Sequence, residues 1–275
     1  MPELPEVETV MRGLDGHLTG RRIAVARLNR PDIRFLVPPE LPAVLTGAVV
    51  LGFRRRGKFM LMRLDSGYSV LIHLGMSGRM LLDAPPALHE HLSIETEEGG
   101  RVGFVDPRRF GVLDLLRTVD EDAHKMLAGM GPEPLGNEFS GPVLAAKLKG
   151  KVTAIKVALL DQRIVAGIGN IYASEALFRA GISPTRAAGK VSRPRIEALV
   201  QSIRETLIEA IAAGGSSLRD YVQPSGELGY FQHAWKVYGR TGEACESCPG
   251  EPVCAGIKCI TQGGRSTFYC ARTQK

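Results

Sequence analysis

The first nine residues of the chain, MPELPEVET, carry the groups with the clearest capacity for chemistry. Pro2 follows the initiator Met1, and its small ring permits removal of that methionine, which leaves a free secondary amine. An α-amine has a reference pKa of about 8, so a useful fraction is unprotonated at neutral pH. Such an amine can attack a sugar C1′ and form an iminium ion, the electron sink that permits elimination of the flanking phosphates.

Two carboxylates accompany this amine. Glu3 is its neighbour and Glu6 lies one helical turn further on, so one can shuttle protons while the other orients the N-terminus. Acids in a first helical turn also suit the helix dipole. The motif by itself therefore leaves a structural interpretation open beside the catalytic one.

Three later segments carry groups that suit contact with a nucleic acid. Lys58 ends the basic run RRRGK at a turn between two apolar stretches. Met76 lies between glycines after a predicted strand and suits an exposed apolar wedge, although a lone methionine more often fills a core. The segment DPRRFG offers Arg108 and Phe110 on a second loop. A solvated basic edge and ordinary core packing are the competing interpretations.

The cysteines are confined to one end of the chain. All 5 lie between Cys245 and Cys270. An odd number of cysteines crowded into one segment of a cytosolic chain is more typical of a metal site than of a disulfide framework.

The apolar pattern divides the chain into a β-rich part and a helical part. Short apolar runs between about residues 20 and 118, separated by Gly, Pro and Asp, predict an antiparallel β-sandwich or barrel. The Gly- and Pro-rich segment 129–139 marks a domain boundary. A first helix is predicted over 1–13, and helices are predicted beyond the boundary over 140–148, 153–160, 170–180, 192–213 and 216–222.

Composition favours a polyanionic partner and a cytoplasmic location. Lys and Arg number 35 against 29 acids, a formal charge of +6. The N-terminus lacks the apolar core of a signal peptide, and no stretch approaches the roughly 20 apolar residues that span a bilayer. We expect a bacterial cytoplasmic monomer that acts at the nucleoid.

MPELPEVET, GIGNIYASEALF and GGRSTFYC, together with the loops above, closely resemble formamidopyrimidine-DNA glycosylases, the bacterial 8-oxoguanine glycosylase family, along nearly the whole chain. The resemblance implies an α+β fold: an N-terminal antiparallel β-sandwich domain (1–132), a helical helix–two-turn–helix domain (133–234) and a C-terminal zinc-finger-like β-hairpin (235–275). It implies excision of oxidised purines from double-stranded DNA bound in a cleft, through a Schiff base on Pro2 followed by β,δ-elimination.

The resemblance also assigns roles to residues. Met76 would fill the vacated base stack, Phe110 would wedge beside the opposite base, and Arg108 would bond the orphaned cytosine. Asn170, which can also cap its helix, would bind a phosphate, and Glu175 would support the N-terminal amine. The expected catalytic residues are Pro2, Glu3, Glu6, Lys58 and Arg265. The expected DNA-binding residues are His73, Met76, His89, Arg108, Phe110, Lys156, Asn170, Glu175, Arg219 and Tyr238.

The metal ligands depart from the family pattern of two CxxC pairs. Thr273 stands where the fourth thiolate belongs, and threonine is a poor zinc ligand. Cys254 lies at about the family's usual distance from Cys270 along the sequence, so it can supply the missing thiolate. We expect one structural Zn²⁺ held by Cys245, Cys248, Cys270 and Cys254, with a weak site or a metal-free finger as alternatives.

Three other functions remain open at this point. An endonuclease VIII-like enzyme would remove oxidised pyrimidines, but that branch usually has Gly in place of Leu4 and lacks the Arg108 and Phe110 pattern. A non-catalytic damage-binding protein would need no Pro2, Glu3 or Lys58. A nucleic-acid-binding or ribosome-associated module using the helix–two-turn–helix alone would need no long β domain.

Overall fold

The computed structural model describes residues 1–216, 229–248 and 254–275, and its chain forms two compact units. Unit 1 comprises Met1–Gly129 and Ile211–Gln232, and unit 2 comprises Met130–Ala210 and His233–Lys275. Arg219, the expected helix 216–222 beyond its first residue and the start of the loop that follows it lie outside the described residues. Within the described ranges, no helix has the length and apolar character needed to cross a membrane.

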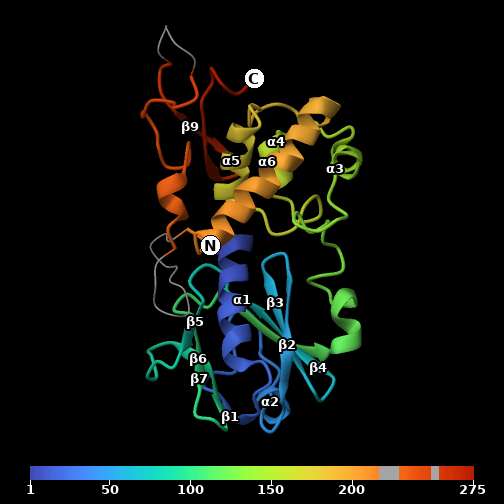
Figure 1. The fold of residues 1–275 in the computed structure, drawn as a ribbon. Coiled ribbons are helices and arrows are strands. Elements are labelled where there is room, and N and C mark those ends of the chain that lie inside the picture. Colours follow the sequence, from blue (N-terminus) through green and yellow to red (C-terminus); the bar gives the residue numbers. More distant parts are fainter. Residues whose placement is uncertain (217–228, 249–253) are drawn as a thin grey trace. The chain divides into compact units, whose positions relative to one another are not determined.

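Unit 1 is built on two four-stranded antiparallel sheets (Figure 1), which confirms the predicted β-sandwich. The first has the order β1 (Ile23–Leu28), β6 (Glu90–Thr96), β7 (Arg101–Val105), β5 (Arg79–Leu82). The second has the order β2 (Val50–Arg56), β3 (Phe59–Leu64), β4 (Tyr68–His73), β8 (Val112–Arg117).

Helix α1 (Leu4–Leu18) closes this sandwich. Its apolar residues recur at helical spacing and are buried in the same core as residues of both sheets. It contacts β2 and β3 of one sheet and β5 of the other, and the short helix α2 (Leu41–Leu45) contacts β1. The helix begins later than the predicted 1–13, because Glu3 is its N-cap residue, and it continues to Leu18.

The hairpin of β2 and β3 fixes the place of Lys58. Arg56 pairs with Phe59, so Gly57 and Lys58 form a two-residue turn. Gly57 has φ +58°, a conformation that glycine adopts without strain and that type II′ hairpin turns require at their first position. Lys58 therefore leaves the tip of the hairpin, and its side chain is buried.

Unit 2 contains the predicted helices and a terminal hairpin. Helices α3 (Gly141–Leu148), α4 (Ile155–Leu159), α5 (Asn170–Arg179) and α6 (Arg193–Ala212) match the expected segments, and the last two residues of α6 belong to unit 1. Strands β9 (Lys258–Gln262) and β10 (Arg265–Tyr269) form the hairpin. Short 3₁₀ helices cover Thr118–Ala123 (η1, in unit 1), Ala188–Lys190 (η2) and Phe231–Ala234 (η3).

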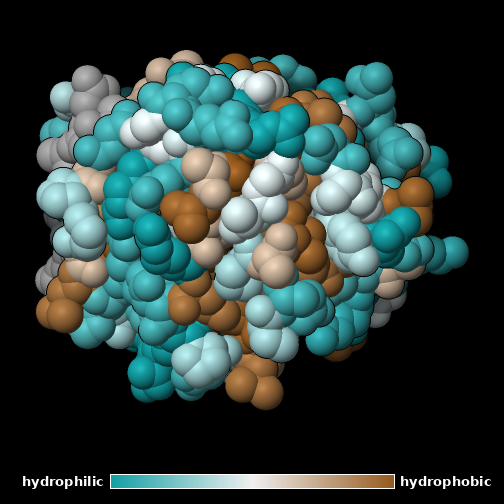
Figure 2. All heavy atoms as spheres, turned by 90° about the horizontal axis from the view of Figure 1, so that it is seen from below, coloured by the Kyte–Doolittle hydropathy of each residue, from teal (hydrophilic) through white to brown (hydrophobic). Residues whose placement is uncertain are grey.

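On the face drawn in Figure 2, hydrophobic atoms form several separate groups among hydrophilic ones. Large apolar side chains that are exposed include Phe35, Leu36 and Leu51 of unit 1. Exposed apolar residues in small groups are normal on protein surfaces.

A buried carboxylate joins η1 to the second sheet. Glu121 is 2% exposed and accepts hydrogen bonds from Arg54 on β2, Arg63 on β3 and Ser69 on β4. Burial alone raises the pKa of a carboxyl group, but the bonds from Arg63, Arg54 and Ser69 outweigh it and lower the pKa of Glu121 from 4.5 to about 2.

Glu121→Gln is expected to lower the free energy of unfolding at pH 7 by about 3 kcal/mol, because it leaves two guanidinium groups beside a neutral side chain. The folded-state pKa is depressed, so the wild-type contribution is complete above pH 4.5 and is lost as the pH falls towards about 2. Urea unfolding from pH 6 to pH 3 measures both effects. Asp122→Asn is the matched control, since this carboxylate is 75% exposed and pairs with Arg54 alone, and should change stability by less than about 0.5 kcal/mol. Equal effects of the two substitutions would contradict this account.

Candidate active site and metal centre

The first residues of the chain are buried and held in place. Pro2 and Glu3 are both buried, and the backbone N–H of Glu3 donates to Glu6 Oε2 at 2.8 Å in a capping box. The other oxygen of Glu6 accepts from the backbone N–H of Ser216 at 2.8 Å. Gly215 has φ +82°, and a Cβ there would lie 3.0 Å from Glu6 Oε1. Glu6 therefore joins the start of α1 to the segment that follows α6.

His73, at the end of β4, is a neutral imidazole. Burial, followed by the positive charges of Lys58 and Arg34, lowers the pKa of His73 to about 4. Its Nδ1 accepts from the backbone N–H of Gly75 at 3.1 Å. A neutral imidazole that accepts at Nδ1 carries its proton on Nε2, so His73 presents a donor.

A cavity of about 670 Å³ brings four of the expected DNA-binding residues together, His73, Met76, Arg108 and Phe110. It is lined by Met1, Asp32, Ile33, Arg34, His73, Gly75, Met76, Arg108, Arg109 and Phe110. Met76 is 38% and Phe110 42% exposed, and the Arg108 guanidinium lies 5.0 Å from the centre of the Phe110 ring. His89 is exposed at φ +65° and is not among the lining residues. Because Met1 lines this cavity, removing it would open the space beside Pro2.

Asp106, Ser77 and His91 were not predicted from the sequence as site residues. All three are buried: Ser77 and Asp106 belong to the two loops that carry Met76, Arg108 and Phe110, and His91 lies on β6. The sequence did contain one indication for Asp106, because this acid ends an apolar strand and directly precedes a proline and two arginines. A solvated turn was the simpler interpretation of that pattern.

In unit 2, Lys156 organises the start of α5. Its side chain is fully buried, and Nζ donates to Asn170 Oδ1 at 2.5 Å, to the Ser266 carbonyl at 2.9 Å and to Thr267 Oγ1 at 2.7 Å. Asn170 does not cap the helix as its type suggested, because Gly169 is the N-cap residue and Asn170 is already helical. The Asn170 Nδ2 instead donates to the Ser266 carbonyl at 3.0 Å.

Glu175 holds the segment that carries Tyr238. Its oxygens accept from the backbone N–H groups of Lys236, Val237 and Tyr238 at 2.9, 3.0 and 2.8 Å. Burial raises the pKa of Glu175 against the effect of these bonds. The Tyr238 ring packs edge-on against Phe268, with centroids 5.0 Å apart. The expected support of the N-terminal amine by Glu175 stays a prediction.

Arg265 is exposed at the tip of the β9–β10 hairpin. Gly263 and Gly264 form the turn with φ +54° and +72°, the positive values that a type I′ turn requires at both central positions. The structure thus presents this guanidinium on a short, well-defined turn.

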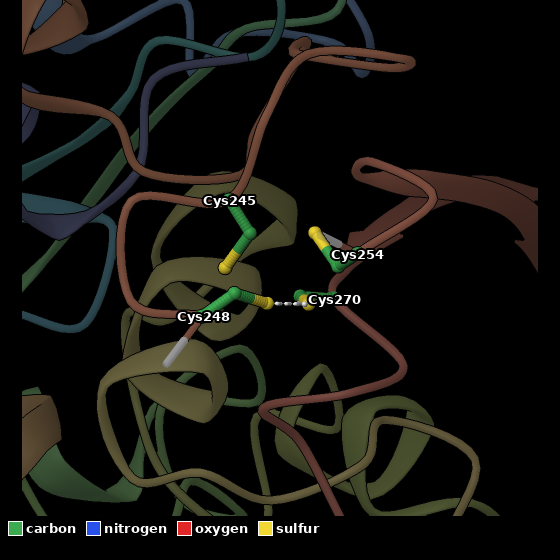
Figure 3. Close-up of side chains that lie close together, drawn as sticks. All are labelled: Cys245, Cys248, Cys254 and Cys270. Atoms are coloured by element: carbon green, nitrogen blue, oxygen red, sulfur yellow. Dashed lines mark hydrogen bonds between the residues drawn. The ribbon is translucent and has the colours of Figure 1, made fainter. Parts of the chain in front are cut away.

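Four of the five cysteines form one cluster (Figure 3). The sulfur atoms of Cys245, Cys248, Cys254 and Cys270 all lie within 4.8 Å of one another. Cys259 is exposed on β9 and is not part of the cluster. The Thr273 hydroxyl lies 3.5 Å from the sulfur atoms of Cys245 and Cys248. Burial raises the pKa of a thiol, but hydrogen bonds, first from Thr273, lower the pKa of Cys270 to about 6 and favour its thiolate.

Comparison with known proteins covers the whole chain. Residues 1–113 match the family model of the formamidopyrimidine-DNA glycosylase N-terminal domain, and residues 130–222 match that of the formamidopyrimidine-DNA glycosylase H2TH domain. A formamidopyrimidine-DNA glycosylase of Acidiphilium cryptum is 64% identical over 275 residues, and one of Cereibacter sphaeroides is 55% identical over 287 residues, each with 100% of both chains covered.

Solved structures show the same fold. A Lactococcus lactis Fpg mutant in complex with Fapy-dG-containing DNA has a TM-score of 0.90 and 34% identity, with 100% of both chains covered. The L. lactis protein with abasic-site DNA has a TM-score of 0.89 and 34% identity over 99% of both chains. The Thermus thermophilus protein has a TM-score of 0.88 and 38% identity, covering 99% of this chain and 98% of that one.

Lys156→Met is expected to lower the free energy of unfolding by about 3 kcal/mol, because the acceptors on Asn170, Ser266 and Thr267 lose the buried donor that they share. Amide hydrogen exchange should become faster in β9 and β10 while β2 and β3 keep their protection, which mass spectrometry of peptic fragments can resolve. Lys149→Met, at an exposed lysine, makes the same chemical change and should leave both regions as they are. Uniform loss of protection across both units would show that Lys156 has no local role.

Proposed function

The chain belongs to the formamidopyrimidine-DNA glycosylase family, a family of bifunctional DNA-repair enzymes, and we propose that it excises oxidised purines from duplex DNA with the Pro2 amine as nucleophile. Its substrates would be 8-oxoguanine and formamidopyrimidines opposite cytosine, in the bacterial cytoplasm at the nucleoid. In this proposal, segment 1–132 performs catalysis, while 133–234 and the finger 235–275 bind the DNA.

The observation that supports this reaction best is the fixed start of the chain. Chain termini usually fray, yet Pro2 and Glu3 are buried and Glu6 bonds to backbone N–H groups on two separate segments. A nucleophile must be held close to its attack geometry, and this arrangement supplies such positioning. Glu6 thereby acts as a positioning residue, which leaves Glu3 as the proton donor.

The chemical steps follow from a secondary amine. The Pro2 nitrogen bonds to C1′, and the glycosidic bond breaks with its electron pair passing to the base, which is protonated. Glu3 protonates the sugar oxygen as the ring opens, giving an iminium ion. Loss of a C2′ proton then expels the 3′-phosphate, and a second elimination expels the 5′-phosphate. Lys58 and Arg265 assist by donating protons or by stabilising phosphate charge.

The predicted DNA contacts are of two kinds, those that enter the duplex and those that bind phosphates. Met76, Arg108 and Phe110 would enter the duplex, where wedging costs a few kcal/mol of unstacking. The Nε2 donor of neutral His73, together with Asn170 and Tyr238, would bind phosphates. We propose that Lys156 and Glu175 act through the residues that they hold, since their charged groups are buried on protein acceptors and donors.

The cysteine cluster fits a structural zinc ion. Tetrahedral coordination at a Zn–S distance of about 2.3 Å places sulfur atoms about 3.8 Å apart, and the four sulfurs already lie within 4.8 Å of one another. Cys254 would supply the fourth thiolate, and the Thr273 hydroxyl would donate to coordinated sulfur rather than bind the metal. When bound, zinc would hold the finger that presents Arg265.

Borohydride trapping on a duplex with one 8-oxoguanine opposite cytosine tests the nucleophile. The Met1-processed wild type should form a covalent adduct, and Pro2→Gly should form at least tenfold less, because it lacks the secondary amine. Pro5→Ala changes a nearby proline without touching the amine and should trap as wild type does. Tight binding without an adduct would favour the damage-binding alternative, and a preference for oxidised pyrimidines in a lesion panel would favour the endonuclease VIII-like one.

The metal content of variants tests the ligand set. Wild type should carry one equivalent of zinc by mass spectrometry, and Cys254→Ser should retain well below one after dialysis, because one thiolate of four is missing. Cys259→Ser is the matched control on the same finger and should retain the full equivalent, as should Thr273→Ala. Full zinc content in Cys254→Ser would remove Cys254 from the set.

A further inference from the structure

We propose that Asp106 is a positioning residue that holds the loops of residues 74–78 and 106–111 together, so that Met76, Arg108 and Phe110 enter DNA as one preformed wedge. This inference rests on the proposed function, which needs those three side chains in the base stack. Asp106 lines neither the cavity nor the buried start of the chain, and its side chain is fully buried.

Both oxygens of the Asp106 carboxylate are used, one on each loop. Oδ1 accepts from the Ser77 hydroxyl at 2.6 Å, and Oδ2 accepts from the backbone N–H of Gly111 at 2.7 Å. The Ser77 oxygen in turn accepts from the backbone N–H of Arg108 at 3.2 Å. Hydrogen bonds to an ionised acceptor are stronger than neutral ones, so a single buried charge fixes the backbone on both sides of Phe110.

Backbone contacts hold Asp106 itself. Its carbonyl accepts from His91 Nε2 at 2.8 Å and from the Arg109 N–H at 3.2 Å, and its own N–H donates to the His89 carbonyl at 3.1 Å. The strand β6, which contains His91, therefore supports the second loop from below. His89, whose side chain is exposed, is joined to the wedge loops through this backbone bond.

The two loops also touch without intervening side chains. Gly75 has φ +64°, and a Cβ there would lie 2.4 Å from the Phe110 carbonyl carbon. Glycine at this position therefore lets the two backbones approach more closely than a residue with a Cβ would allow. Met76 is thereby fixed relative to Phe110, as a wedge that fills one stack position requires.

Positioning of Met76, Arg108 and Phe110 affects the steps before elimination. Everting a base and reading the opposite cytosine depend on the wedge, whereas elimination at a preformed abasic site depends on the amine and its acid. Disrupting Asp106 should therefore slow base excision and weaken discrimination of the opposite base, while it leaves Schiff-base formation at an abasic site intact.

Asp106→Asn and Ser77→Ala test this, with protein in excess over DNA. The amide of Asn can accept from only one of the two donors, and Ser77→Ala removes the bond that reaches Arg108. Single-turnover excision of 8-oxoguanine opposite cytosine should fall at least tenfold in Asp106→Asn, and the rate ratio for cytosine over adenine opposite the lesion should narrow. Trapping on a preformed abasic-site duplex should stay within about twofold of wild type.

Glu121→Gln provides the control for general destabilisation, since it alters another buried carboxylate of unit 1. It should lower Tm without changing the opposite-base ratio. The double variant Asp106→Asn/Ser77→Ala should be no slower than Asp106→Asn, because both changes break one network.

Two results would overturn the inference: an unchanged opposite-base ratio in both single variants, or a parallel fall in excision and abasic-site trapping. Failure of the wild type to trap on abasic-site DNA would instead reject the proposed function, and it is seen before any variant is compared. If Asp106→Asn does not fold, the same comparison of excision, opposite-base ratio and abasic-site trapping is made with Ser77→Ala alone.

Discussion

The chemistry proposed for this protein depends on bonds that hold the first three residues of the chain in place. A terminal segment has the greatest conformational freedom in a polypeptide, so its order must be supplied by bonds to the rest of the fold. Glu6 supplies them with one carboxylate, which accepts from Glu3 at the start of α1 and from Ser216 after α6. The amphipathic face of α1, buried against both sheets, gives this carboxylate a rigid base.

Buried ionisable side chains that bond to other segments occur in both units. Lys156 and Glu175 in unit 2, and Asp106 in unit 1, are buried ionisable side chains whose partners are backbone groups or small polar side chains of other segments. Burying a charge costs free energy that such bonds only partly repay, so these residues are poor choices for stability alone. What they provide is fixed geometry, because each charge determines the placement of several backbone groups at once.

The finger brings four cysteine sulfur atoms together although one position of the two-CxxC pattern is occupied by threonine. Because Thr273 stands in the usual place of a thiolate, a site with four sulfur ligands needs its fourth cysteine from elsewhere in the chain. Cys254, in the segment before β9, brings its sulfur atom within 4.8 Å of those of Cys245, Cys248 and Cys270. The hydroxyl of Thr273 remains 3.5 Å from two of the sulfur atoms, a distance that suits a weak O–H···S bond. The exposed Cys259, although nearer in sequence to Cys270 than Cys254 is, lies outside the cluster.

The sequence by itself determined the N-terminal motif, the helices between residues 139 and 213, most apolar strands and the four-cysteine set, because these depend on local residue type, periodicity and spacing. It did not reveal β6, whose buried residues include Glu90, His91 and Ser93, since their polarity hides the strand pattern. The N-cap at Gly169, the burial of Lys156 and the bonds of Asp106 to the loops of residues 74–78 and 106–111 were decided only by the tertiary structure. A buried charge looks the same in sequence as a solvated one, and only distant segments that bring acceptors or donors to it distinguish the two.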